Sequence, residues 1–160
     1  MSTRKKISEI NYKISDINEL EIHIPSLSEE LYENFDEDKL SFGFNFGYAW
    51  NTEENKFSVF LDIVFTYDPQ ELNENLLHFV GEVEYEILDL KKYLSKKQNE
   101  ADFPEDFLAI LTGIAISTMR GIVAIRTLGK FQNRFYLPIV NPVELVKDYL
   151  KALEGNELIS

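Results

Sequence analysis

The chain contains no cysteine, and its 160 residues include only 2 histidines, 5 prolines and 7 glycines. The lack of cysteine excludes a disulfide scaffold and thiolate metal sites, and it is typical of proteins of the cytoplasm. The basic start, Arg4-Lys5-Lys6, is not followed by the apolar segment of a signal sequence. We therefore expect a cytoplasmic protein that is stabilised by an apolar core.

Basic residues are also scarce. The chain has 16 lysines and arginines against 28 acidic residues, which gives a net charge of −12. Such a chain repels a phosphate backbone, and its basic runs are limited to the start and to residues 91–97. Nucleic acid is therefore not an expected partner, whereas basic or unfolded protein surfaces are.

Apolar residues make up 44% of the chain and aromatic residues 13%, which is enough to build one domain over residues 1–160. The longest apolar run, Phe107–Leu128, is interrupted by Arg120 and Arg126. Charges within such a run are costly in a bilayer. We therefore interpret the run as a helix of the protein and expect no membrane insertion.

The first half of the sequence alternates with period two, which predicts β-strands. In residues 40–50 one face is large and aromatic, and the other is small. The same alternation predicts strands over residues 57–67 and 76–88, and a bulged edge strand over residues 7–24. The predicted sheet, residues 7–88, is an antiparallel four-stranded meander with one aromatic face and one acidic, hydrated face.

The second half of the sequence predicts two helices. A long apolar helix spans residues 103–128 and ends before Gly129, and a shorter C-terminal helix spans residues 141–154. Asn141 and the proline after it form a typical helix start, and Gly155 is a typical stop. The predicted fold class is therefore α+β, with the sheet packed by both helices.

Small residues recur every four positions along the long helix, at Ala109, Gly113, Ser117 and Gly121. Such a row lets another backbone approach closely. In one interpretation it packs against the sheet or the last helix of the same chain. In the other it forms a helix pair across a subunit interface, which we favour because the opposite side of the helix is also apolar. We therefore predict a homo-oligomer.

The sequence contains no arrangement of residues typical of a catalytic, cofactor or metal site. His23 and His78 lie in predicted strands with no nucleophile or ligand cluster nearby in sequence. We expect structural roles for both histidines, and we expect neither enzyme activity nor a bound cofactor or metal.

One predicted strand places Glu82, Glu84 and Glu86 on the same face, with Asp62 on the neighbouring strand. Same-face neighbours on a strand lie roughly 6–7 Å apart, which is too far for one ion. The acidic set is therefore either a solvated face or a protein-docking face.

Three segments resemble the SecB family of export chaperones. Residues 79–83, Phe-Val-Gly-Glu-Val, resemble the family's fourth strand. Met119-Arg120, with Gly-Lys-Phe at residues 129–131, is similar to the family's Ala-Arg pair and the Gly-Thr-Phe that follows it. Residues 138–141, Pro-Ile-Val-Asn, resemble the Pro-Val-Asn that opens the last helix, although Ser117-Thr118 replaces the family's Pro-Tyr. The chain is thus similar to a divergent SecB-like protein.

This resemblance implies an ATP-independent chaperone, a holdase, that binds unfolded preproteins for export through the Sec pathway. It also implies a homotetramer, a dimer of dimers, in which the long helices lie between two sheets. The acidic sheet face would dock the SecA translocation motor. Val80 and Glu82 match the docking strand, Asp16 is a further candidate, and Glu84 and Asp62 share the predicted face.

A holdase needs exposed apolar surface that binds extended chains. The candidates are aromatic residues at the end of one strand and in the loop after the long helix: Phe46, Tyr48, Trp50, Phe131, Phe135 and Tyr136. We expect Phe42, Phe44 and Phe46, in the middle of the strand, to belong largely to the core.

Two other functions fit the sequence. A dedicated SecB-like chaperone of a single partner, such as an antitoxin, would keep the fold, and loss of the docking face would favour it. A small-ligand-binding protein or enzyme would instead need a deep, closed pocket lined by His78 or Arg120. For Arg120 we expect an acidic partner or the capping of carbonyl groups.

Overall fold

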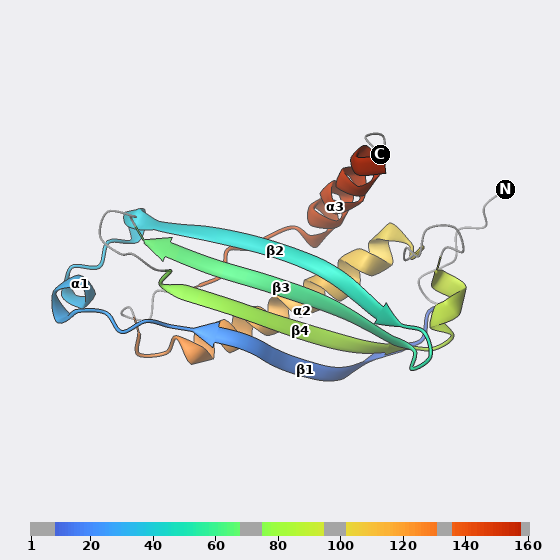
Figure 1. The fold of residues 1–160 in the computed structure, drawn as a ribbon, viewed down its shortest axis with the longest axis horizontal. Helices are drawn as coiled ribbons and strands as arrows, with labels where there is room; N and C mark the ends of the chain where they lie inside the picture. Colours follow the sequence, from blue (N-terminus) through green and yellow to red (C-terminus); the bar gives the residue numbers. More distant parts are fainter. Residues whose placement is uncertain (1–8, 68–74, 95–101, 131–135, 158–160) are drawn as a thin grey trace.

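The computed structural model describes residues 9–67, 75–94, 102–130 and 136–157. A curved sheet carries one long helix across one of its faces, and a second helix extends beyond one edge (Figure 1). In chain order the main elements are β1 (Tyr12–His23), α1 (Glu29–Glu33), β2 (Leu40–Asn51), β3 (Lys56–Tyr67), β4 (Leu77–Ile87), α2 (Glu105–Arg126) and α3 (Pro142–Glu157). Two 3₁₀ turns, η2 (Glu37–Lys39) and η3 (Leu90–Tyr93), precede β2 and follow β4.

The four strands lie in the order β1-β4-β3-β2, and each neighbouring pair is antiparallel. The predicted α+β class and four-stranded antiparallel sheet are confirmed. The predicted meander is wrong for β1, which pairs with β4 and not with β2, in a Greek-key order. Residues 24–39 carry the chain from one edge of the sheet to the other. Alternation in the sequence locates a strand but does not say which strand it pairs with.

Strand β1 is the bulged edge strand that its irregular alternation predicted. Its register with β4 shifts between Ile14 and Asp16, and again between Glu19 and Glu21. Each shift leaves a residue of β1 without an opposite partner, which bends the strand and increases its twist.

The core lies between the sheet and α2. The odd-numbered residues of β3 and β4 point toward α2 and are almost fully buried, among them Phe57, Phe79 and Tyr85. The Tyr85 hydroxyl donates a hydrogen bond to the Leu111 carbonyl at 2.7 Å. The one polar atom of this buried ring is therefore satisfied.

Both helices begin and end close to the predicted residues. Gly129 follows α2 with a φ of 75°, a left-handed conformation that glycine adopts without strain. At the start of α3, Asn141 Oδ1 accepts a hydrogen bond from the Val143 N–H at 3.1 Å, as a cap should. The helix continues through Gly155 to Glu157, so the predicted end at residue 154 is too early.

Helix α2 is long and apolar enough to span a membrane by length and composition alone, with a mean hydropathy of 1.9. In this structure 44% of that segment is buried, because one side of α2 packs against the sheet. The central helix of a water-soluble domain has the same composition, so the hydropathy of α2 does not by itself indicate a membrane.

Candidate functional site

Five aromatic side chains form a row along the helix-facing side of β2. They occupy alternate positions, which places them on one face of the sheet: Phe42, Phe44, Phe46, Tyr48 and Trp50. From Phe42 to Tyr48 the centroids of successive rings lie 6.1, 6.1 and 5.7 Å apart. All five are half-buried, so they line the core and also leave aromatic surface open.

The end of the row is held by contacts to β3 and α2. Trp50 stacks on Phe57 with a centroid distance of 6.3 Å, and Tyr48 lies 5.5 Å from the same ring. The Tyr48 hydroxyl lies 2.7 Å from Thr112 Oγ1, which connects β2 to α2. Burial raises the pKa of Tyr48 to about 12, because the phenolate would lose its hydration. Tyr48 is therefore a neutral, fixed member of the row.

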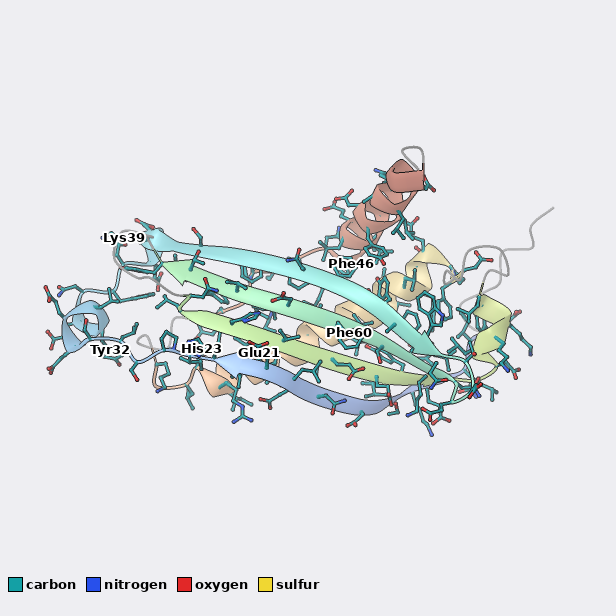
Figure 2. All side chains as sticks on the ribbon, viewed as in Figure 1. Glu21, His23, Tyr32, Lys39, Phe46 and Phe60 are labelled. Atoms are coloured by element: carbon teal, nitrogen blue, oxygen red, sulfur yellow. The ribbon has the colours of Figure 1, made fainter. Side chains whose placement is uncertain are left out.

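Helix α3 adds a further ring to this row. The Tyr149 centroid lies 5.3 Å from Phe46 and 5.2 Å from Tyr48, and Figure 2 shows Phe46 on β2 beside α3. We call the five β2 rings and Tyr149 the aromatic strip. Tyr149 is not among the binding residues predicted from the sequence, although the spacing of Val146, Tyr149 and Leu153 predicts an apolar helix face.

The structure brings together three of the six aromatic residues that were predicted to bind extended chains. Phe46, Tyr48 and Trp50 lie in the aromatic strip, whereas Tyr136 is 69% exposed and makes no ring contact with the strip within the part of the chain that the structure describes. Phe131 and Phe135 lie outside the described residues. Phe42, Phe44 and Phe46 pack against the core, as expected, but they remain half-buried.

The stripe of small residues on α2 divides into two parts. Ala109 is buried, and a Cβ placed on Gly113 would lie 3.2 Å from Pro142 Cγ at the start of α3. Ser117 and Gly121 are exposed, and no described atom lies within 4 Å of a Cβ placed on Gly121. Gly113 therefore packs against the start of the last helix of the same chain, whereas Ser117 and Gly121 are exposed.

An open groove of about 740 Å³ runs along the outer side of α2, between that helix and residues 139–143. Its lining is mainly apolar and includes Ile110 and Ile114. Beyond it, at the end of α2, Ile125 is 73% exposed and Leu128 is 72% exposed. The outer side of α2 thus presents apolar side chains that remain exposed in the part of the chain that the structure describes.

Arg120 caps carbonyl groups, which is one of the two roles expected for it. Its Nη2 donates a hydrogen bond to the Pro138 carbonyl at 3.0 Å, and its Nε donates to the Leu137 carbonyl at 3.4 Å. The side chain lines the open groove and not a closed pocket. It holds the segment that precedes α3 against α2.

The predicted docking residues lie together on the sheet face that points away from α2. Asp16 is opposite Glu84 across β1 and β4, and Asp62 is opposite Val80 across β3 and β4. Lys56 Nζ lies 2.5 Å from Glu84 Oε1, and the Ser15 hydroxyl donates to the same oxygen at 2.7 Å. These hydrogen bonds, that of Lys56 first, hold the pKa of Glu84 below its usual value.

Further charge on this face is also paired. Asn18 Nδ2 donates to Glu82 Oε2 at 3.0 Å, and Lys13 forms an ion pair with Glu86 at 3.1 Å. Lys13 offsets the charge of Glu86, whereas the Asn18 amide is neutral and leaves the charge of Glu82 on this face.

His78 lies on the same face between two carboxylates. Its Nε2 is 3.0 Å from Asp62 Oδ1 and its Nδ1 is 3.2 Å from Glu21 Oε1. Since carboxylate oxygens only accept, both contacts are satisfied when both ring nitrogens donate. The cluster joins β1, β4 and β3, which fits the structural role expected of His78. Within the described ranges, no group of three or more histidine or acidic side chains is placed to hold a metal ion.

No protein-family model matches the chain, and no curated protein matches its sequence. Among solved structures, the fold is similar to Rv1957, a SecB-like chaperone of Mycobacterium tuberculosis solved in complex with a ChAD peptide from the antitoxin Rv1956 HigA1. The two chains are 13% identical with a TM-score of 0.47, over 81% of this chain and 90% of the other. The fold is also similar to a protein of unknown function from Streptococcus agalactiae, with 15% identity and a TM-score of 0.48 over 82% and 98% of the two chains.

Proposed function

We propose that this protein is an ATP-independent holdase that binds extended segments of unfolded proteins along the aromatic strip. The observation that carries the proposal is the row of half-exposed rings on β2, which continues onto α3 through Tyr149. A ring that packs against an apolar client side chain contributes about 1.5–3 kcal/mol before ordering costs. A few such contacts are enough for weak, rapidly exchanging binding.

The proposed function needs no catalytic group. It requires apolar surface and enough charge to keep the chaperone–client complex in solution, and the net charge of −12 supplies the second requirement. We propose a cytoplasmic location, because nascent and unfolded chains are available there and the chain has no cysteine.

We further propose that the protein works as a homo-oligomer, a tetramer by its resemblance to SecB. The uncovered apolar side chains on the outer side of α2 and the open positions Ser117 and Gly121 support this proposal. A second chain packed there would remove Ile125 and Leu128 from water.

We consider two destinations for the bound client: export through the Sec pathway, and delivery to a single dedicated partner. Export through the Sec pathway is supported by the grouping of Val80, Glu82, Glu84, Asp62 and Asp16 on one sheet face. Service to a single partner, such as an antitoxin, is favoured by the ion pair of Glu84 with Lys56 and by the contact of Asp62 with His78, because both carboxylates already have partners within the chain. Calorimetric titration of the protein with SecA separates them: Glu82→Lys should abolish binding in the first case, and no binding should occur in the second.

The aggregation of a chemically unfolded client in the presence of the purified protein tests the holdase. We expect the parent protein to suppress aggregation, and we expect Phe46→Ala and Trp50→Ala to hold the client more weakly while keeping their circular dichroism. Tyr32→Ala is the matched control, since Tyr32 lies on α1, far from Phe46 (Figure 2). If the parent protein does not affect the client, the holdase proposal is wrong; if both strip variants hold as well as the parent, the strip is not the binding site.

A further inference from the structure

Strand β2 is the outermost strand of the sheet on the side opposite β1 (Figure 1). All twelve of its residues, Leu40–Asn51, pair with β3 without a register shift. In the turn before the strand the Leu40 N–H donates to the Glu37 carbonyl. For residues 41–51, no main-chain partner outside β3 is found among the residues that the structure describes. Half of its N–H and C=O groups therefore point away from β3, to the outer edge of the sheet.

The register identifies the residues whose backbone points outward. The Ile87 N–H donates to the Asn55 carbonyl at 2.9 Å, and Asn55 and Ile87 are opposite each other in the unshifted register of β3 and β4. Opposite residues in an antiparallel pair alternate between bonded and non-bonded. The odd-numbered residues of β3 therefore bond to β4, and its even-numbered residues bond to β2.

In the register of β2 and β3, even-numbered residues of β3 are opposite odd-numbered residues of β2, as in the pair Gly47 and Phe60. The odd-numbered residues of β2 therefore bond to β3. The N–H and C=O groups of its even-numbered residues point to the outer edge of the sheet. These are the five residues whose rings form the row on β2, and Leu40, whose N–H already donates to the Glu37 carbonyl. The free backbone groups and the half-exposed aromatic surface thus belong to the same residues.

Natural proteins protect edge strands with charges, prolines, bulges or short length. Strand β1 at the other edge has two bulges and four charged residues, Lys13, Asp16, Glu19 and Glu21. Strand β2 has twelve residues with no charge, no proline and no bulge. An edge this long and uncharged is suited to receive another strand.

We propose that β2 receives an extended segment of an unfolded polypeptide as an added strand, which is paired through its main chain to residues 40–50. The inference rests on the proposed holdase function and specifies how the client is held. Main-chain pairing recognises any extended sequence, and the aromatic side of β2 favours clients with an apolar residue at every second position.

The charges at the two ends of β2 define the client further. Three acidic residues and one basic residue, Asp36–Lys39, precede the strand, and Glu53 and Glu54 follow it, whereas the strand itself is uncharged. The complementary client is a short apolar segment, extended over the strand, with basic residues at both ends.

A backbone-modified peptide tests this proposal. The probe is a synthetic peptide that alternates phenylalanine with threonine and carries two lysines at each end. In one version the backbone nitrogen of every second residue is methylated. In a second version the backbone nitrogens of the remaining residues are methylated. An added strand points only one of the two sets of N–H groups toward β2, so one version should bind about tenfold more weakly and the other within about twofold of the unmodified probe.

The outcomes distinguish this inference from the holdase proposal. If the unmodified probe binds and both methylated versions bind equally well, the rings alone hold the client and the added strand is refuted. If the unmodified probe and unfolded clients all fail to bind, the holdase proposal is refuted as well.

A pair of protein variants gives an independent measurement. Phe44→Pro removes an N–H that points to the free edge, and proline is tolerated at such a position on an edge strand. Phe44→Ala removes the same ring and keeps the N–H. We expect the proline variant to bind the probe about tenfold more weakly than the alanine variant. If both variants keep the parent's circular dichroism and bind the probe equally well, the proposal is overturned. It is also overturned if the proline variant alone loses oligomer mass in light scattering, because the edge would then join two copies of this chain.

Discussion

At the scale of single residues, the structure explains why particular residue types stand at positions that the sequence analysis singled out. Gly81 lies in the segment that resembles the SecB fourth strand, and it allows α2 to approach the sheet. A Cβ placed on Gly81 would lie 2.3 Å from Met119 Sδ and 2.9 Å from Phe79 Cε1. A methyl group at this position would therefore displace the side chains of Met119 and Phe79.

We expect Gly81→Ala to lower the free energy of unfolding by about 1–3 kcal/mol, because Met119 and Phe79 must move to accept the methyl group. Gly47→Ala is the matched control, since no described atom lies within 4 Å of a Cβ placed there. Urea denaturation of both variants measures the difference. A Gly81→Ala variant as stable as Gly47→Ala would show that Met119 has room to move.

The pairing of Glu84 with Lys56 and Ser15 predicts a pH-dependent contribution to stability. The pKa of Glu84 is lower in the folded chain than in the unfolded chain, so the folded state binds fewer protons at this site. The contribution is present above the unfolded pKa and is lost as the pH falls through the folded pKa. Glu84→Gln should therefore be less stable than the parent at neutral pH, and the two should converge as the pH falls from about 5 to about 3. A difference that does not depend on pH in this range would contradict the assignment.

At the scale of elements, α3 is the part on which the site depends most. It reaches β2 through Tyr149, and its first turn is capped by Asn141. Arg120 holds the preceding segment against α2. The position of Tyr149 in the aromatic strip therefore depends on the Asn141 cap and on the two hydrogen bonds that Arg120 donates to carbonyl groups.

We expect Asn141→Ala to destabilise α3 by about 1 kcal/mol, because the Val143 N–H loses its acceptor. Hydrogen exchange should become faster in α3 and stay unchanged in β3 and β4, and client holding should weaken. Asn141→Asp keeps an acceptor oxygen and should exchange like the parent. Equal exchange in α3 of the alanine variant and the parent would show that the cap does not hold the helix in place.

At the scale of the whole molecule, one face of the sheet is covered by α2, and the outer side of α2 remains open. Its apolar groove and the exposed Ile125 and Leu128 are the basis for the proposed oligomer. A surface of this kind commonly marks a protein–protein interface.

We expect the parent protein to have the mass of a dimer or tetramer in light scattering. Ile110→Glu combined with Ile125→Glu should reduce this mass toward that of the monomer, because two buried carboxylates would cost more than the interface gains. Leu88→Glu is the matched control: Leu88 is also exposed, but it follows β4 and is not part of α2. A parent protein that is a monomer would refute the oligomer proposal.

The sequence alone determined the α+β class, the location of all four strands, the bulges of β1 and the start of α3. These features depend on local causes: alternation of apolar residues, capping side chains and glycine in a left-handed conformation. The same local patterns also placed Phe46, Tyr48 and Trp50 on one face, because residues two apart on a strand share a side.

Only the tertiary structure decided which elements meet. It placed β1 beside β4, left β2 as a free edge, brought Tyr149 against Phe46, and divided the small-residue stripe at Gly113 between the last helix and open surface. Each of these outcomes joins residues that are far apart in the sequence. Periodicity shows which face of an element is apolar, but the partner that covers this face is selected by the packing of the whole chain.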